Sequence, residues 1–427
     1  MIAVSALVNQ ILAFFIATAL VSLIIPRLGP FLSLVAAAMV YGLLSGMGPD
    51  LMGFVTTGLG RIFSTLAIVV FSGAVLAEYL RMTGAIDRIV SDLLKISQRG
   101  LLISGLAGYL VSLPVMCSVT AYMILDPVVS NFGRRTEGSA RRLQAMTAVC
   151  SIVSFNLIYP SPVMVALSGS LGLEPYDMLL LGLPISVVLF AMAYLYMLRL
   201  PSGALATIEG SAPTISKLKA WAPLVLPMVL ILFGAVDGVV LAGTSAMPVL
   251  SGTEGWIKFI GSPSIALLIG ALLSLALARD RVQEMVRTAT RRSGVIMLDL
   301  CGAGAFGYVV AQSGLGQALF EALGHILPVL VLPFLLASML QMAQGSRVVT
   351  AVVSVQIFGS YPLDGMTLAL LICAGAFMFS YISDPYFWLV KESTGSSMRE
   401  MVRDYTLPLT LLGLAAFAAA ALHSALL

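Results

Sequence analysis

The chain has few charged residues for its length. Of its 427 residues, 10% are charged and 59% are hydrophobic, and the mean hydropathy is +1.02. An ordinary soluble domain carries about 25% charged residues. The net charge of +3 is small and the basic residues cluster in loops, so nucleic-acid binding has no support. The composition therefore predicts an all-α polytopic membrane protein that is embedded in a lipid bilayer.

Cysteine and histidine are scarce as well. The cysteines lie in apolar segments without CxxC spacing, which predicts buried thiols and no disulfides, and the histidines form no ligand cluster. We therefore expect neither a metal site nor a cofactor. No Gly-x-Ser-x-Gly, HExxH or spaced aspartate pair supports a membrane-embedded hydrolase, so an enzyme is not expected. These residues are Cys117, Cys150, Cys301, Cys373, His325 and His423.

Apolar runs and basic loops divide the chain into spans. Leu7–Ile25 lacks a basic region and a cleavage site and is expected to be a retained span. Leu28–Met47 and Ile62–Leu80 follow, with Leu51–Gly60 as a short surface piece between them. The basic, amphipathic segment Arg81–Arg99 is expected on the cytoplasmic surface. Later spans are expected at Trp221–Ala242, Ser264–Ala278, Gly294–Val310 and Thr406–Leu426.

The apolar segment Leu101–Ser130 has basic residues on both flanks. If both flanks are cytoplasmic, the segment must enter the membrane and return on the same side. A spanning helix needs about 20 residues, so the stretch is too short for two crossings. It therefore predicts a re-entrant helical hairpin at about residues 100–130, with its tip near Pro114–Thr120.

Two further segments are apolar helices interrupted at proline. The first, about residues 143–170, breaks at Tyr159-Pro160-Ser161-Pro162, and the second, about residues 363–390, breaks before Pro385. The freed backbone groups cannot be satisfied by lipid, so such breaks are expected inside protein or beside a wet cavity. Between them, a second hairpin is predicted at about residues 326–359, interrupted by polar residues from Gln341 to Arg347.

The two halves of the chain are similar to each other. Gly73–Tyr79 reads like Gly302–Tyr308, and each copy is followed by an amphipathic segment, an interrupted apolar stretch and a broken helix. The first hairpin opens to the cytoplasm and the second, by charge, to the outside. We therefore expect two inverted repeats, residues 1–199 and 221–427, joined by a cytoplasmic linker at 200–220. Four features recurring in one order argue against two unrelated halves, and such repeats place substrate near the midplane.

The stretch Phe377–Glu392 carries the strongest chemical signal. Ser380, Ser383 and Asp384 come together directly before Pro385. A carboxylate and two hydroxyls at a helix break indicate an ion or substrate site, because an intramembrane carboxylate needs a partner. The alternative is a proline kink whose hydroxyls bond back to their own helix.

Arg347 is the first candidate for substrate binding. A lone guanidinium in an apolar stretch is costly unless it faces a cavity or a partner, and its planar fork suits a carboxylate. The alternative is a structural ion pair with Asp384 or Asp126. Helix N-termini at the tip also favour anions. The predicted substrate-binding residues are Ser118, Thr120, Asn156, Ser161, Gly345, Ser346, Arg347, Ser380, Ser383 and Asp384.

Three carboxylates could couple transport to protons. Asp384 lies at the proposed site, and its protonation could respond to an anion bound beside Arg347. Glu78 and Asp299 lie in apolar segments and are the alternatives, although Glu78 is near the membrane boundary. Sodium coupling stays open, because serine hydroxyls, carbonyls and one carboxylate also suit a hard cation.

Phe379–Glu392, FSYISDPYFWLVKE, resembles the gluconate permease (GntP) family of the ion transporter superfamily, whose pattern there is close to FSHVNDPGFWLFKE. Gly302–Gly316 and the Gly345-Ser346 pair look like further family segments, and the likeness extends over nearly the whole chain. Several positions depart from the pattern. Tyr159 and Tyr381 stand where the family has histidine, and Gln341 stands where it has the hairpin arginine. Val119 or a near neighbour stands where the family has an acidic residue in the first hairpin.

The resemblance implies a secondary active transporter of the cell (inner) membrane. It implies uptake of a small carboxylate, a sugar acid or hydroxy monocarboxylate such as gluconate, together with protons. It also implies a homodimer in which hairpins and broken helices move as an elevator against a fixed scaffold. A sodium-coupled di- or tricarboxylate transporter and an anion channel remain the alternatives.

Overall fold

The structure is a computed structural model that describes residues 2–97, 99–133, 137–200, 215–243, 254–323, 327–359, 361–381 and 383–427. Within these ranges the chain forms helices and no β-strand. Seven helices are long and apolar enough to cross a bilayer, or eight if the bent pair α10–α11 counts as one span. This confirms the prediction of an all-α polytopic membrane protein. His325 and most of the predicted linker at 200–220 lie outside the described ranges.

The N-terminal helix α1 (Ile2–Leu44) is two helices that meet at Gly29. Gly29 has φ 77° and ψ 167°, a conformation that glycine adopts without strain. The two halves pack against each other, since the rings of Phe14 and Tyr41 lie 6.5 Å apart. Gln10 and Tyr41 both hydrogen-bond to Ser313. The two predicted N-terminal spans are therefore a pair of packed helices.

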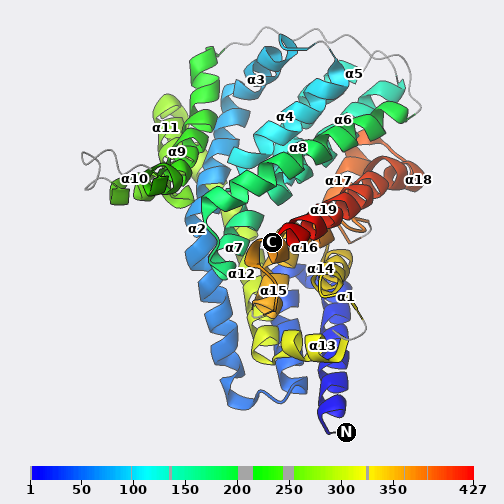
Figure 1. Cartoon of the computed structure of the whole chain (residues 1–427). Coiled ribbons are helices and arrows are strands. Elements are labelled where there is room, and N and C mark those ends of the chain that lie inside the picture. Colours follow the sequence, from blue (N-terminus) through cyan, green and yellow to red (C-terminus); the bar gives the residue numbers. More distant parts are fainter. Residues whose placement is uncertain are drawn as a thin grey trace.

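Two long helices, α2 (Leu51–Thr83) and α12 (Val282–Gln312), form the wall along which the other elements pack, and α1 runs beside them (Figure 1). The two helices touch at Gly58 and Gly304, where a methyl group on either would overlap the backbone of the other. The prediction that Leu51–Gly60 is a separate surface piece is wrong. Its buried residues Leu51, Val55 and Gly58 continue the packed face of α2, so the helix has no reason to end at Gly60.

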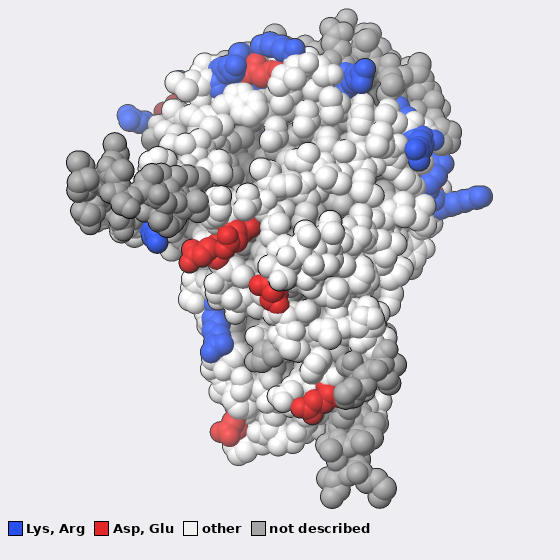
Figure 2. All heavy atoms as spheres, viewed as in Figure 1, with Lys and Arg blue, Asp and Glu red and all other residues white. Residues whose placement is uncertain are grey.

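The helix α3 (Ala85–Leu94) is amphipathic, as the sequence predicts. Its buried face includes Ile86 and Ile89, and it also buries Asp92. Burial raises the pKa of Asp92, but hydrogen bonds from Lys95, Trp221 and Arg88 outweigh it and bring the pKa to about 2. Figure 2 shows Lys and Arg gathered at the end of the molecule where Figure 1 places α3, α5 and α18. By the positive-inside rule, this is the cytoplasmic end.

Two helix–turn–helix pairs lie where the hairpins are expected. The first consists of α4 (Gly100–Val115) and α5 (Ser118–Gly133), and Met116 at its turn has φ 56°. The second consists of α14 (Val331–Gln344) and α15 (Arg347–Phe358), and Gly345 at its turn has φ 72°. Each turn is only two residues long, so each pair brings its helix ends to one point.

Two interrupted helices form the centre of the molecule. They are α6 (Glu137–Leu157) with α7 (Pro162–Leu171), and α16 (Gly365–Ala376) with α17 (Pro385–Thr394). The most apolar part of the first is wholly buried, and in α16 every residue from Met366 to Ala376 is buried. The helices that lead into both breaks are thus covered by protein, which keeps their polar groups away from lipid.

The same order of elements occurs twice: a long helix, a short helix, a helix pair, an interrupted helix and an apolar helix. The first series runs from α2 to α8 and the second from α12 to α19, with the short α18 inserted in the second. The remaining elements are η1 (Gly48–Asp50), α8 (Pro175–Arg199), α9 (Lys217–Gly243), α10 (Glu254–Gly261), α11 (Pro263–Leu277), η2 (Arg279–Arg281), α13 (Leu315–Leu323), α18 (Met398–Met401), the π-helical turn η3 (Val402–Thr406) and α19 (Leu407–Leu426).

Candidate functional site

A cavity of about 250 Å³ lies where both helix-pair turns and both interrupted helices meet α1 and the wall of α2 and α12. We call it the central cavity. Its polar lining comes from the two turns, from α12 and from the break before α17. The predicted site residues among its lining are Ser118, Asp299, Gly345, Ser346, Arg347, Ser383 and Asp384.

The break between α16 and α17 places Asp384 at the start of a helix. Pro385 occupies the first turn of α17, where its missing N–H costs nothing, and Asp384 takes the extended N-cap conformation. One oxygen of Asp384, Oδ1, accepts a hydrogen bond of 2.9 Å from the backbone N–H of Tyr386. The other oxygen, Oδ2, is thereby left to face the neighbouring helix pair.

Arg347 at the start of α15 pairs with that oxygen. Its Nη2 lies 3.1 Å from Asp384 Oδ2 and donates to Ser380 Oγ at 2.8 Å. The hydroxyl of Tyr405 donates to the same carboxylate oxygen at 2.9 Å. The side chains of Arg347 and Asp384 are only 5% and 2% exposed, so the pair is buried, and removing one partner would leave an uncompensated charge.

Part of the Arg347 guanidinium has no partner in the described part of the chain. All of its hydrogen bonds to described residues use Nη2, and Nε is buried without a partner. A buried N–H without an acceptor is costly. Because Arg347 lines the central cavity, a carboxylate bound there could accept from the unused donors.

The turn between α14 and α15 is pressed against the break. A methyl group on Gly345 would overlap the carbonyl of Ser383 and the Cα of Asp384. Ser346 caps α15 by accepting from the N–H of Val349. The Ser383 hydroxyl donates to the carbonyl of Met342 on α14. The hydroxyls at the break therefore reach across to the helix pair and Arg347 and do not bond back to their own helix.

The other predicted binding residues lie outside the cavity lining. Asn156 donates 2.8 Å to the carbonyl of Cys373, which ties α6 to α16, and its own carbonyl oxygen is buried without a partner. Ser161 is buried as the N-cap of α7. Thr120 is half-buried in α5, where its N–H lies 3.4 Å from Cys117 Sγ. Ser380 does not line the cavity, but its Oγ accepts a hydrogen bond from Arg347, which does.

Two of the three predicted coupling carboxylates line the cavity, and the third does not. Asp299 on α12 accepts at 3.2 Å from the N–H of Phe31, beside the break in α1. Glu78 is fully buried between Arg81 at 2.7 Å and Arg292 at 2.6 Å, where it joins α2 to α12. Asp126, the other suggested partner of Arg347, instead accepts from Gln144 at 2.6 Å.

Sequence reasoning missed Tyr405 and the residues of the α1 break. Tyr405 reaches Asp384 from the π-helical turn Val402–Thr406, and nothing in its local sequence distinguishes it from an interfacial tyrosine. Pro30 lines the cavity beside Asp299. The sequence signal near Pro30 is the interruption between Ile25 and Leu28, and it predicts only a boundary between two spans.

The described part of the chain contains seven or eight apolar helices long enough to span a bilayer and a buried charged cavity, which together define a multi-pass membrane transport protein. The family model of the GntP family permeases matches residues 6–426, so the chain belongs to this family, as the resemblance predicts. It is 28% identical to the low-affinity gluconate transporter of Escherichia coli K12 over 417 residues, which cover 91% of each chain. It is 25% identical to the D-serine transporter DsdX of that strain, covering 88% of this chain and 89% of the relative.

A solved structure has the same fold. The YdaH transporter of Alcanivorax borkumensis aligns with a TM-score of 0.60 at 16% identity, covering 87% of this chain and 88% of that one. The protein is thus a multi-pass inner-membrane permease with a small-molecule substrate, and it is not an enzyme.

The contact at Gly345 generates the first prediction. Gly345→Ala should lower the melting temperature of the detergent-solubilised protein, because a side chain at positive φ is strained and this one also overlaps the break. Gly395→Ala is the matched control, since Gly395 has φ 64° but no neighbour within 4 Å. The two variants should differ by about 1–3 kcal/mol in their free energy of unfolding, which is the cost of overpacking. Equal losses would contradict the packing of turn against break.

Proposed function

We propose that this permease is a symporter that imports a small carboxylate, a sugar acid or hydroxy monocarboxylate such as gluconate, together with protons. The observation that carries the proposal is the buried Arg347–Asp384 pair, which lines a cavity between a helix-pair turn and a helix break and keeps unused donors on Arg347. Intramembrane charges of this kind mark substrate pathways.

The substrate class follows from the cavity and from the relatives. Gluconate and D-serine, named for two relatives, are both monocarboxylates that carry a hydrogen-bonding group on the neighbouring carbon. Arg347 supplies the cation among the lining residues, and Ser118 and Ser346 supply hydroxyls. A single guanidinium favours one carboxylate, which argues against di- and tricarboxylates as preferred substrates.

The charges around the cavity support proton coupling. The charged lining residues are Arg347, Asp384 and Asp299, which sum to one negative charge when all are ionised. An anionic substrate would add a second negative charge in a site that is shielded from water, where uncompensated charge is costly. Uptake of a proton by Asp299 or Asp384 offsets this cost, and so would a sodium ion.

The proposed mechanism is elevator-type alternating access within a homodimer. The repeated order of elements supports two inverted repeats, which would unite α4–α7 and α14–α17 in one moving unit. This unit would slide along α1 and the wall of α2 and α12. Small residues at the contacts, such as Gly307 of α12 against Val353 of α15, give the sliding surface few protrusions.

The direct test is uptake into proteoliposomes that contain the purified protein. A panel of gluconate, D-serine, lactate, succinate and citrate should be measured under a proton gradient alone and under a sodium gradient alone. We expect saturable, proton-driven accumulation of a hydroxy monocarboxylate. Sodium-driven uptake of succinate or citrate would favour the alternative of a sodium-coupled di- or tricarboxylate transporter. Conductive flux without saturation would favour an anion channel.

A double-mutant cycle separates binding by Arg347 from a structural ion pair. Arg347→Gln and Asp384→Asn should each cost about 3–5 kcal/mol of stability, because each leaves a buried charge unpaired. The double variant removes both charges, so we expect it to recover the melting temperature but not uptake.

Recovery of uptake in the double variant would show that the pair is structural only. Glu78→Gln is the matched control, since it disrupts a buried ion cluster outside the central cavity. In that variant the protein should be less stable while the KM for substrate stays unchanged.

Asp299 is the proposed coupling residue, because it lines the cavity and forms no ion pair in the described part of the chain. Asp299→Asn should abolish accumulation driven by a proton gradient, since the amide cannot bind the proton. Exchange of external for internal substrate should persist, because it needs no net proton movement. Undiminished proton-driven accumulation in this variant would remove Asp299 from the coupling step.

A further inference from the structure

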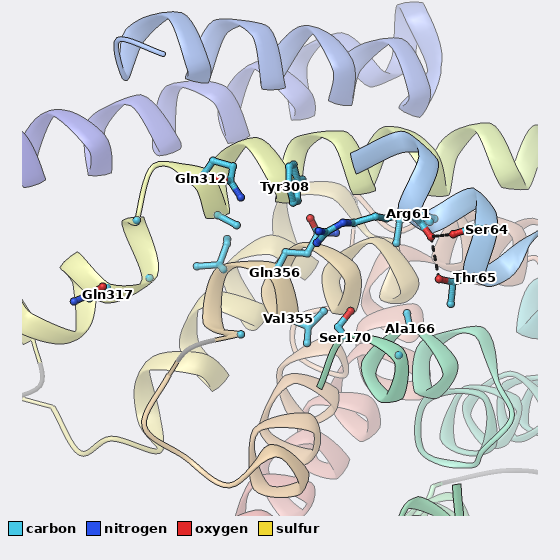
Figure 3. A pocket seen from close by; sticks show the side chains of 17 residues that line it. Arg61, Ser64, Thr65, Ala166, Ser170, Tyr308, Gln312, Gln317, Val355 and Gln356 are labelled. Atoms are coloured by element: carbon cyan, nitrogen blue, oxygen red, sulfur yellow. Dashed lines mark hydrogen bonds between the residues drawn. The ribbon is translucent and has the colours of Figure 1, made fainter. Parts of the chain in front are cut away.

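A second hollow of about 570 Å³ lies between α2, α7, α12, α13 and α15, and it shares no lining residue with the central cavity. Figure 3 shows Arg61 of α2 reaching into it toward Gln356 of α15, with Tyr308 of α12 alongside. None of its lining residues is Asp or Glu, so Arg61 gives the hollow a net positive charge. We call it the outer hollow.

Its position argues for an opening away from the cytoplasm. Tyr308 and Gln312 lie in the last turns of α12, the helix that begins directly after the basic turn Arg279–Arg281. Arg61 lies in the half of α2 remote from Arg81, which borders the basic end. The hollow is therefore nearer the end of the wall that is opposite the basic, cytoplasmic loops.

Arg61 contacts an aromatic ring, and this contact leaves the positive charge of its guanidinium uncompensated. Its guanidinium lies 4.7 Å from the centre of the Tyr308 ring, and it forms no ion pair with any residue the structure describes. A charge in a membrane-spanning helix is costly and usually faces a water-filled cavity. Stacking on an aromatic ring occupies the flat face of a guanidinium and leaves the N–H groups at its edge free to bind an anion.

Gln356 supplies an unused acceptor beside this cation. Its Oε1 is buried and has no hydrogen-bond partner among the residues that the structure describes. Ser64 and Thr65 also line the hollow, but both donate 2.9 Å hydrogen bonds to the carbonyl of Arg61 and have no proton left to offer. A cation next to a free acceptor matches a carboxylate that carries an O–H or N–H donor on a neighbouring carbon.

The outer hollow and the central cavity lie along the same helices. On α15, Val349 lines the central cavity and Val355 lines the outer hollow. On α12, the corresponding residues are Leu300 and Tyr308. At 1.5 Å per residue these steps are about 9 Å and about 12 Å. Between the two hollows, α12 and α15 touch at Gly307 and Val353, so a closed contact separates them.

We propose that the outer hollow is a second binding site, in which Arg61 captures the carboxylate of the substrate before it reaches Arg347. This inference rests on the proposed function for the identity of the ligand. The attraction of anions to an outward-facing Arg61 can be tested without transport. Arg61 lowers the concentration of substrate needed for uptake, while Arg347 is required for passage.

The test uses Ser170→Cys, an exposed position that lines the outer hollow. Intact cells expressing this variant are treated with membrane-impermeant methanethiosulfonates, one carrying a sulfonate and one a quaternary ammonium. The unsubstituted protein, with its four cysteines, gives the background rate. We expect the anionic reagent to modify Cys at this position faster than the cationic one. The ratio of the anionic to the cationic labelling rate should fall at least several-fold when Arg61→Gln is added. Arg61→Lys should keep the ratio, because it keeps the charge.

Equal rates for the two reagents, or no modification from outside, would overturn the proposal whatever the protein transports. In proteoliposomes, Arg61→Gln should raise the KM for gluconate about tenfold, the loss expected for one charge-assisted contact, and leave the maximal rate unchanged. An unchanged KM would overturn the capture role. If no carboxylate is taken up by the wild type, the proposed function fails, while the labelling ratio still decides whether Arg61 makes an anion site.

Discussion

The ion pair between Arg347 and Asp384 is the contact on which the interior depends. Both residues stand at helix N-termini, Arg347 as the first residue of α15 and Asp384 as the N-cap of α17. Gly345 brings the turn of one helix pair against the break of the next helix, and the pair forms across that contact. Without Arg347, the carboxylate would be buried with only hydroxyl and N–H partners, which is a costly state for a charge.

The apolar parts of the interrupted helices α6 and α16 are covered by protein. Asn156 of α6 donates a hydrogen bond to a carbonyl of α16. The helices that face outward over part of their length, such as α8 and α19, are continuous and mostly apolar. The arrangement follows from the bilayer, which tolerates side chains of apolar type but no free N–H or C=O groups.

The wall of α2 and α12 connects the charged sites of the molecule. Glu78 binds Arg81 and Arg292 near the cytoplasmic end, Asp299 lies at the central cavity, and Arg61 lies at the outer hollow. The close approach of Gly58 and Gly304 holds the two helices together. Each charged position along this wall thus has a fixed distance from the others.

The sequence by itself determined the membrane class, the positions of both helix-pair turns, both proline breaks and the family, because hydropathy, basic flanks and proline act locally. It also named seven of the residues that line the central cavity, since charges and hydroxyls in apolar stretches need a partner. It could not give the continuity of α2 through Leu51–Gly60, the exclusion of Asn156 and Ser161 from the cavity, or the contact of Tyr405 with Asp384. Only the tertiary structure decided these, because they depend on which face of each helix meets its neighbours.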